Sequence, residues 1–499
     1  MAAAGERLAR WRPRVAALFA GAAAVLVFPR IGLDWLAWVV LVPWLALLRG
    51  ARDWRQAAVA GWLGGAGYLL ACEYWLAPDL TAFFPVAVAL VGLLWAPWAV
   101  LTRRLLSQAD TLPGALRALV AVPAGWTLVE AARSWPVLGG AWNPLGASQW
   151  RHPAVLGLAA LGAVWLVGAA VVAVNTAVLL LLTGRRATRA AAGAAVFVVS
   201  AAGPCWFALH QPTGTTSARV TLVQPGLDAD PARRLAAGIA LTRQPAAPPR
   251  SAGTDLVVWG ESSVPYDLSS RPDLRARLAA LSGAIGAPLL VDVDATRRDG
   301  SIAKVSVLLD RRGITGQYIK TRLVPFGEYV PLRSALGWLH LVSKAAAVNR
   351  TAGTGPVVLR TAAGLPIGPL TCFESSFPDM ARTLAVRGAR LVVYQSSTST
   401  FQGSYVQDQQ ASLLALRAAE TGRPVVQAAL TGDSAAYDAA GRRLGVLPST
   451  ARGTLTVAVP LAARETPYDR FGNTLLFIPL LGVVAAICSL PIRASSRAL

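Results

Sequence analysis

Long apolar runs dominate the chain up to residue 212, and the residues that follow alternate short apolar stretches with amphipathic ones. A bilayer is spanned by about 20 apolar helical residues. Runs near that length predict seven transmembrane helices before residue 212 and an eighth near the C-terminus, at residues 14–29, 32–48, 56–76, 83–102, 115–133, 154–183, 190–209 and 472–490. We therefore expect a helical membrane bundle over residues 1–212, a soluble domain over 218–463 and a last transmembrane helix over 472–490.

The first run has a second interpretation, because four Arg residues precede it as in a secretory signal peptide. No small-residue cleavage site follows the run, and Phe28-Pro29-Arg30 leads directly into the next apolar stretch. This continuity favours a retained helix.

Arginine is distributed unevenly between the loops that join these runs. One side holds 15, namely Arg7, Arg10, Arg12, Arg14, Arg49, Arg52, Arg55, Arg103, Arg104, Arg117, Arg185, Arg186, Arg189, Arg493 and Arg497. The short loops of the other side hold only Arg30, Arg133 and Arg151. Cytoplasmic loops carry the excess of Lys and Arg. We therefore expect a multi-pass protein of the cell (inner or plasma) membrane, with both termini in the cytoplasm and the soluble domain on the extracytoplasmic side.

The composition agrees with a membrane protein and sets limits on its partners. The chain has 499 residues, of which 54% are hydrophobic and 15% charged, and its formal net charge is +21. Nucleic-acid binding requires basic residues interleaved with aromatic ones on one face, yet the soluble domain has only Trp259 and Trp338. Anionic lipid headgroups are the more plausible counter-charge, and no nucleic-acid partner is expected.

Short β-branched apolar runs predict seven strands in the soluble domain, at residues 219–224, 255–259, 287–293, 303–309, 365–371, 390–394 and 424–429. Helical patterns lie at 231–243, 271–285, 377–388 and 404–421. This alternation favours an α/β sandwich with layers in the order αββα and largely buried sheets.

Three reactive side chains stand where predicted strands of this domain end: the carboxylate of Glu261, the ammonium of Lys320 and the thiol of Cys372. Strand ends of one sandwich converge on one edge, so these groups can meet. Cys372 is the single cysteine of the domain, while Cys72, Cys205 and Cys488 lie in or beside apolar runs. Lone cysteines are most often buried and inert, but a thiol kept in an oxidising compartment suggests use.

A thiol with a pKa near ~8.5 needs a base or a stabilised thiolate to act as a nucleophile. The three histidines, His152, His210 and His340, lie beside apolar runs or in an apolar loop. None has acidic or Cys neighbours at metal-ligand spacing, so a zinc site is unsupported. Glu261 is therefore the candidate base.

Lysine is rare in this chain, since only three of the 47 Lys plus Arg residues are Lys. Alone, Glu261 and Lys320 are each more readily explained as surface charges, but a Lys retained before a Pro-rich turn indicates a site that needs a compact ammonium. Glu328 and Glu374 are candidates for ordering the Lys320 and Cys372 loops, or they form ordinary ion pairs.

These residues resemble those of a known family. The spacing of Glu261, Lys320 and Cys372 is similar to the catalytic triad of the nitrilase or carbon-nitrogen hydrolase superfamily. The segment Lys320-Thr-Arg-Leu-Val-Pro-Phe-Gly-Glu-Tyr-Val-Pro331 resembles a signature of apolipoprotein N-acyltransferases, and so does the order of seven helices, soluble domain and last helix. Arg417-Ala-Ala-Glu420-Thr-Gly422-Arg423-Pro424 resembles the family's helix-to-strand turn behind the active site.

The resemblance implies a fold, a reaction and partners. It implies a nitrilase-like domain in which Cys372 takes an acyl chain from a phospholipid as a thioester and passes it to the α-amine of a diacylglyceryl-modified N-terminal Cys of a lipoprotein. Glu261 would be the base and Lys320 the oxyanion partner, and no diffusible cofactor or metal would be needed. Phe373 occupies the position of an aromatic residue after the nucleophile.

The apolar segment 335–342, with Trp338, is a candidate lid at the membrane interface or, equally, a core-packing helix. Two features depart from the family pattern: residues 395–401 read Gln-Ser-Ser-Thr-Ser-Thr-Phe where the family often has an Asn-x-Ser-x-Asp-x-Trp-Phe segment, and no Trp follows the first strand.

Two other functions remain open at this point. A membrane-anchored amidase or nitrilase would use the same triad with water as acceptor. A transporter or binding scaffold with a degenerate domain would show ionisable residues within its spans, for which Glu73 and Glu130 are the candidates.

Overall fold

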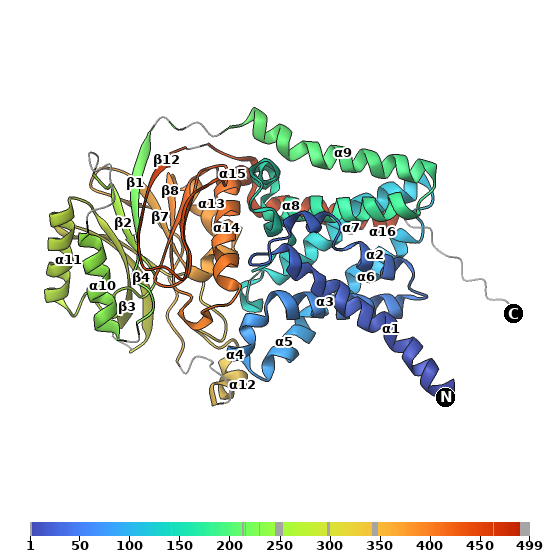
Figure 1. Ribbon diagram of the computed structural model, residues 1–499, viewed down its shortest axis with the longest axis horizontal. Coiled ribbons are helices and arrows are strands. Elements are labelled where there is room, and N and C mark those ends of the chain that lie inside the picture. The colour runs from blue at the N-terminus through green and yellow to red at the C-terminus, as the bar shows by residue number, and fades with distance from the viewer. Residues whose placement is uncertain are drawn as a thin grey trace.

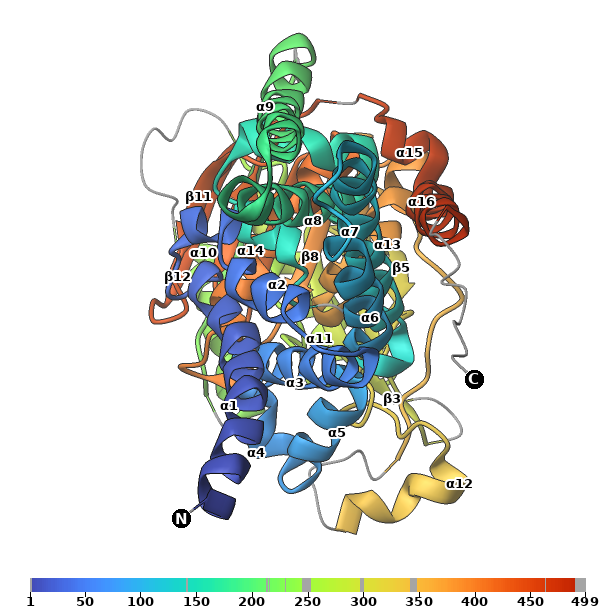
Figure 2. The same ribbon diagram turned by 90° about the vertical axis from the view of Figure 1, so that its right-hand side faces the viewer.

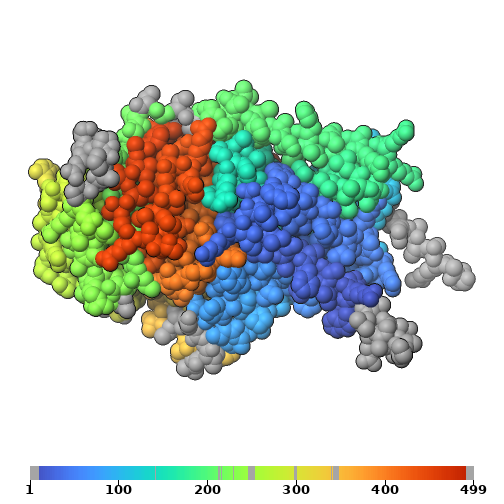
Figure 3. All heavy atoms as spheres, in the orientation of Figure 1, coloured from blue at the N-terminus to red at the C-terminus, as the bar shows by residue number. Residues whose placement is uncertain are grey.

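The computed structural model describes residues 2–140, 142–211, 214, 216–228, 230–244, 253–296, 300–341, 348–462 and 464–489. The molecule has a helical region and an α/β sandwich lying side by side (Figure 1). The atoms of the two regions meet along their boundary on the face drawn in Figure 3. Helix α14 (Val406–Thr421) of the sandwich packs against α8 (Pro153–Thr183) of the helical region.

The helical region contains nine α-helices before residue 212 among the residues described. They are α1 (Ala2–Ala22), α2 (Val42–Arg49), α3 (Trp54–Cys72), α4 (Ala77–Leu80), α5 (Phe83–Gly92), α6 (Trp95–Leu106), α7 (Leu112–Arg133), α8 (Pro153–Thr183) and α9 (Arg186–Leu209). Two further α-helices, α15 (Pro467–Phe471) and α16 (Phe477–Cys488), follow the sandwich and return the chain to this region.

Within the described residues, five helical stretches are long and apolar enough to cross a membrane: Phe83–Leu106, Leu112–Arg133, Pro153–Thr183, Arg186–Leu209 and Pro467–Cys488. The predicted count of eight is therefore not confirmed. The difference lies before residue 77. There the chain forms α1, three short 3₁₀ segments, the eight-residue α2 and α3, none of which combines the required length and hydropathy.

Helix α8 is broken near its middle. Gly162 and Ala163 leave helical geometry, and Ala163 has a φ of 55°. A break frees backbone groups that must find partners in an apolar setting. The Val164 N–H donates to Oε1 of Glu420, on α14 of the sandwich, at 2.9 Å. The break is therefore supported by a carboxylate from the other region.

The sandwich consists of two six-stranded sheets. The first has the order β12-β1-β2-β3-β4-β5 and the second β11-β10-β9-β8-β7-β6. The strands are β1 (Ser217–Gln224), β2 (Leu256–Trp259), β3 (Leu289–Thr296), β4 (Ile302–Asp310), β5 (Gly313–Ile319), β6 (Leu359–Arg360), β7 (Pro366–Thr371), β8 (Leu391–Ser396), β9 (Val425–Ala429), β10 (Ser434–Tyr437), β11 (Arg443–Leu447) and β12 (Gly453–Pro460).

Helices cover the outer face of each sheet, and the predicted αββα layers are confirmed (Figure 1). Helices α10 (Pro231–Arg243) and α11 (Pro272–Ile285) lie on the first sheet, while α13 (Pro378–Val386) and α14 (Val406–Thr421) lie on the second, against the helical region. Apolar residues such as Leu222, Val258 and Val393 fill the space between the sheets. All seven predicted strands are present, and β5, β6, β10, β11 and β12 were not predicted.

Strand direction explains why the candidate site residues meet. Strand β2 is parallel to β3, β3 is antiparallel to β4, and β4 is antiparallel to β5, so β2 and β5 run in the same direction. Glu261 and Lys320 therefore leave the first sheet at the same edge. Cys372 follows β7 of the second sheet directly.

Candidate active site

Glu261 and Lys320 form a buried ion pair. The Lys320 ammonium lies 3.2 Å from Oε1 of Glu261 and donates at 2.9 Å to Oε1 of Glu328. Glu261, Lys320 and Glu328 are 4%, 1% and 6% exposed. The other Glu328 oxygen accepts the Val324 N–H at 2.9 Å, so Glu328 joins the Lys320 ammonium to the backbone of the following loop.

Cys372 begins a single 3₁₀ turn directly after β7 and has a φ of 45°. A non-glycine residue with positive φ is uncommon and often belongs to a functional turn. The Sγ lies 3.9 Å from the Ser397 carbonyl oxygen and 3.5 Å from Nε2 of Gln410, which donates to it. The Cys372 thiol and the Glu261 carboxylate are close enough that each affects the pKa of the other. The structure thus brings Glu261, Lys320 and Cys372 together.

The two sheets approach closely where Glu261 leaves β2. A Cβ at Gly260 would lie only 2.1 Å from the backbone N of Leu430, so a side chain cannot be accommodated there. The Glu261 N–H donates to the Ser396 carbonyl at 3.1 Å, across to the end of β8. The backbone at Glu261 is therefore held from both sheets.

The charges of the cluster set its resting protonation state. Burial alone would raise the pKa of Glu261, but the ammonium groups of Lys320 and Lys304 outweigh it and hold that pKa below its ordinary value. Burial, together with the Glu261 carboxylate, raises the pKa of the Cys372 thiol. The carboxylates of Glu261 and Glu328 raise the pKa of Lys320 in spite of its burial. Near neutral pH the site holds a carboxylate, an ammonium and a protonated thiol.

Glu374 connects the turn of Cys372 to the loop of Lys320. One carboxylate oxygen accepts the Thr371 N–H at 2.7 Å. The other accepts the Tyr318 hydroxyl at 2.5 Å and the Thr321 and Arg322 N–H groups at 2.8 and 3.0 Å. Burial raises the pKa of this carboxyl, and the hydrogen bonds oppose that effect.

The two predicted apolar contacts of the site differ in exposure. Phe373 is 1% exposed and packs between Trp142 and Phe377, with ring centroids 5.9 and 4.9 Å away. Trp338 is 52% exposed, and its ring centroid lies 5.7 Å from that of Phe83 at the start of α5. The segment 333–341 therefore projects from the sandwich toward the helical region, as the position of α12 (Arg333–Leu336) shows in Figure 1.

Sequence reasoning missed three contributors to the site: Lys304, Ser397 and Gln410. Gln410 lies on α14, accepts the Ser396 hydroxyl at 2.6 Å and donates to the Cys372 sulfur. No motif singled out this Gln, because its role depends on the position of α14 behind β8. Lys304 could have been identified from the sequence by the scarcity of lysine in this chain.

Glu73 and Glu130, the two candidate ionisable residues of the predicted spans, have structural partners. The Arg133 guanidinium donates to Glu73 at 2.8 Å, and Oε1 of Glu130 accepts the Leu145 N–H at 2.6 Å. Among the described residues, no group of His, Cys, Asp and Glu is arranged to hold a metal ion.

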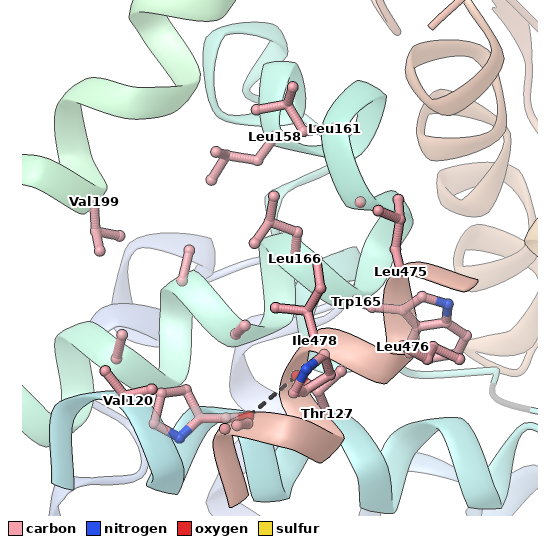
Figure 4. Close-up of a pocket in the computed structure, with 18 of the residues that line it drawn as sticks. Val120, Thr127, Leu158, Leu161, Trp165, Leu166, Val199, Leu475, Leu476 and Ile478 are labelled. Atoms are coloured by element: carbon pink, nitrogen blue, oxygen red, sulfur yellow. Dashed lines mark hydrogen bonds between the residues drawn. The ribbon is translucent and has the colours of Figure 1, made fainter. Parts of the chain in front are cut away.

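An apolar cavity of about 470 Å³ lies in the helical region, apart from this cluster. Its walls come from α7, α8, α9 and the segment leading into α16, with Leu161, Trp165 and Ile478 among the lining residues (Figure 4).

Comparisons with known proteins identify relatives of both regions. The family described as "Apolipoprotein N-acyltransferase N-terminal domain" matches residues 20–177, and "Carbon-nitrogen hydrolase" matches residues 219–468. An apolipoprotein N-acyltransferase of Geobacter metallireducens is 28% identical and covers 95% of each chain. One of Sinorhizobium medicae is 30% identical and covers 88% of each chain. An amidase structure from Nesterenkonia sp. is 21% identical, covers 54% of this chain and 98% of its own, and has a TM-score of 0.40.

Proposed function

The chain belongs to the apolipoprotein N-acyltransferase family, and from this premise we propose that it moves a fatty acyl chain from a membrane phospholipid to a diacylated lipoprotein. The acceptor atom is the α-amine of the lipoprotein's N-terminal diacylglyceryl-Cys. The cluster of Glu261, Lys320 and Cys372 supports this proposal, because it supplies the base, the cation and the nucleophile that acyl transfer requires.

In the first half-reaction the Cys372 sulfur forms a bond to the ester carbonyl carbon of the phospholipid. Glu261 accepts the thiol proton as that bond forms, which is consistent with a carboxylate of lowered pKa beside a protonated thiol. The tetrahedral intermediate collapses with loss of the lysophospholipid alkoxide, which takes the proton from Glu261. A thioester on Cys372 remains.

Lys320 stabilises the oxyanion of that intermediate. An ammonium has three N–H donors, and Glu261 and Glu328 account for two of those on Lys320. The third donor is directed to the oxyanion, with backbone N–H groups of the Cys372 turn as further donors.

In the second half-reaction the lipoprotein amine attacks the thioester carbonyl. Glu261 takes a proton from the amine and returns it to the departing Cys372 sulfur, so that an amide forms and the free thiol is regenerated. Water must be kept from the thioester in the interval. Phe401, four residues after Ser397, packs on Trp75 of the helical region with ring centroids 5.0 Å apart, and this aromatic contact favours the exclusion of water.

Both substrates are anchored in lipid, and this gives the helical region its role. We infer that it holds the sandwich against the extracytoplasmic leaflet of the cell (inner or plasma) membrane, an orientation supported by the 15 Arg residues of the opposite loops. The Trp338 segment and α5 then flank the entrance for acyl chains.

The convergence of Cys372, Glu261 and Lys320 carries the proposal, and the mass of the Cys372 peptide tests it. Full-length protein purified from its own membranes is digested and mapped. We expect a fatty-acyl increment on Cys372 that disappears when a synthetic diacylated lipopeptide is added, with appearance of the triacylated product. An unmodified Cys372 in a protein that hydrolyses short amides would instead establish an amidase.

A further inference from the structure

Two of the three lysines in the chain converge on the same carboxylate. Lys304, on β4, is 6% exposed, and its ammonium lies 3.5 Å from Oε1 of Glu261. It also lies 3.0 Å from Oδ1 of Asp294 and donates to the Ser262 hydroxyl. We propose that Lys304 is a positioning residue for acyl transfer, a second ammonium that holds the Glu261 carboxylate in place beside the thiol. This inference rests on the proposed function of the same site.

The strand register builds this contact into the first sheet. Lys304 on β4 stands directly opposite Asp294 on β3. Its carbonyl accepts the N–H of Lys320 at 2.9 Å, so the residue that directly follows β5 is bonded to the neighbouring strand that carries Lys304. The Glu261 carboxylate lies between their ammonium groups. An Arg at position 304 would present a planar fork in place of a compact ammonium.

The charges that face Glu261 come from several elements. Cations are Lys320 after β5 and Lys304 on β4, with Arg350 3.5 Å from Asp294. Anions are Asp292 and Asp294 on β3 and Glu328 in the loop after Lys320. Without Lys304 the surroundings of Glu261 become more anionic, because Asp294 loses its nearest cation. We expect Glu261 then to bind a proton more readily and to lose its function as a base at low pH.

The test compares Lys304→Met, Lys304→Arg and the exposed control Arg311→Met in the full-length protein. The readout is single-turnover acylation of Cys372 from labelled phospholipid between pH 5 and 9. We expect wild type and Arg311→Met to share one profile, Lys304→Met to lose at least about tenfold more rate at pH 5 than at pH 8, and Lys304→Arg to recover part of that loss. A Lys304→Met profile parallel to wild type would overturn the proposal.

Alkylation of Cys372 by iodoacetamide provides a readout that does not depend on acyl transfer. We expect the same pH difference between Lys304→Met and wild type in the alkylation rate. If wild type shows no acyl-enzyme, the proposed function fails, and the alkylation profile still decides the role of Lys304. A uniform loss at all pH values with a lowered melting temperature would mean that Lys304 serves the fold alone.

A second inference comes from the apolar cavity of the helical region. Its volume of about 470 Å³ lies in the range of ligand pockets, and the described residues that line it are all uncharged. Two walls belong to α9 and α16, which lie at the edge of the helical region (Figure 2). Side chains on these walls are open to the surroundings, since Val198 is 62% and Ile478 65% exposed. In a bilayer this cavity faces hydrocarbon.

A further wall of the cavity is the broken part of α8. Gly162 lines the cavity, and the carboxylate that holds the break belongs to Glu420 of the sandwich. The break in α8 is thus held in place by a hydrogen bond from the sandwich. We infer that the cavity holds one acyl chain of a resident membrane phospholipid, at a site separate from Cys372, since none of the lining residues belongs to the reactive cluster.

The probe is phosphatidylglycerol with a mid-chain diazirine, in nanodiscs that contain the full-length protein. We expect photolabelling of cavity residues such as Leu161 and Leu166, reduced at least about fivefold by Ala169→Phe with Ala173→Phe, which fill the cavity from α8. Ala194→Phe, exposed on α9 outside the lining, is the control and should leave labelling unchanged. Labelling confined to outer faces, or equal in all variants, would overturn the inference.

Discussion

The carboxylate of Glu374, two residues after Cys372, accepts the backbone N–H of Thr321, one residue after Lys320, at 2.8 Å. This bond joins the two sheets of the sandwich, because Lys320 directly follows β5 of the first sheet and Cys372 directly follows β7 of the second. Glu374 accepts the Thr371 N–H with its other oxygen. One buried side chain therefore fixes the separation between thiol and ammonium.

We expect Glu374→Gln to lower the rate of Cys372 acylation while Cys372 and Glu261 remain in place. All four groups that meet the Glu374 carboxylate are donors, and a Gln side chain would present one of them with an NH₂ group. A buried donor left without an acceptor costs about 1–3 kcal/mol. The measurement is single-turnover acylation, with exposed Glu465→Gln as control. Wild-type rates in Glu374→Gln would show that the two loops hold their positions without this bond.

Removal of the Glu420 carboxylate should destabilise the whole chain. Glu420 accepts the Val164 N–H of the broken helix and pairs with the buried Arg417 at 2.8 Å. Glu420→Ala leaves the buried Arg417 guanidinium without its carboxylate partner and the Val164 N–H without an acceptor, and breaking a buried ion pair costs about 3–5 kcal/mol. We expect a clear fall in melting temperature in detergent, whereas Glu465→Ala on the surface should have little effect. An equal melting temperature for both variants would contradict this account of the α8 break.

Asp433 predicts a pH-dependent stability. Burial, followed by the neighbouring Asp408 carboxylate, raises the pKa of Asp433 to about 6, above the value of about 3.9 for an unfolded Asp. The folded chain therefore binds this proton more tightly, and the protein loses stability as pH rises from about 4 through 6. The side chain of Asp433→Asn cannot titrate. The free energy of unfolding of this variant minus that of wild type should therefore be larger above pH 6 than at pH 4, by about 1–2 kcal/mol. Parallel stability curves for the two proteins would refute the raised pKa.

The positions of the strands and helices followed from the sequence wherever local pattern determines them. Helix α14, predicted at 404–421, spans Val406–Thr421, and β8, predicted at 390–394, begins at Leu391. Strand β12 escaped prediction because its burial alternates weakly. It is fixed by pairing along its whole length with β1, which lies more than two hundred residues earlier.

The chemistry of the site was predictable only as far as residue type marks it. Glu261, Lys320 and Cys372 stand at strand ends that a topology can bring together. Gln410 acts on Cys372 through a helix that packs behind β8, and the break of α8 depends on Glu420, 256 residues from Val164. Such tertiary partners leave no periodic signal. The three predicted spans before residue 77 are not confirmed, since apolar content alone does not determine the length of a helix or where the chain breaks it.

The orientation across the membrane remains a prediction from loop charge. A reporter enzyme that is active only outside the cytoplasm should be active when fused after residue 300 and inactive when fused after residue 495. The reason is that 15 Arg residues lie in the loops and termini opposite the sandwich. The matched control is a reporter active only in the cytoplasm, which should give the opposite result at both points. If each reporter instead gave the result expected of the other, the sandwich would lie in the cytoplasm, and the proposed lipoprotein substrates would be contradicted.

The last prediction separates the roles of the three reactive residues. Cys372→Ala removes the nucleophile and should abolish both acyl-enzyme formation and transfer. Glu261→Gln retains the thiol but cannot accept its proton, so thioester formation should slow by about 10² to 10⁴, the usual range for loss of a general base. Lys320→Met removes an oxyanion donor, a loss of about 3 kcal/mol in comparable acyl-transfer sites. It also leaves the Glu261 and Glu328 carboxylates without a shared cation, so raising the pH should restore part of the rate in Lys320→Met and none in Cys372→Ala.

The measurement is the rate at which Cys372 acquires a labelled acyl chain from phospholipid, followed by discharge to a diacylated lipopeptide. Acylation that persists in Cys372→Ala, or a wild-type rate in Lys320→Met, would refute this mechanism.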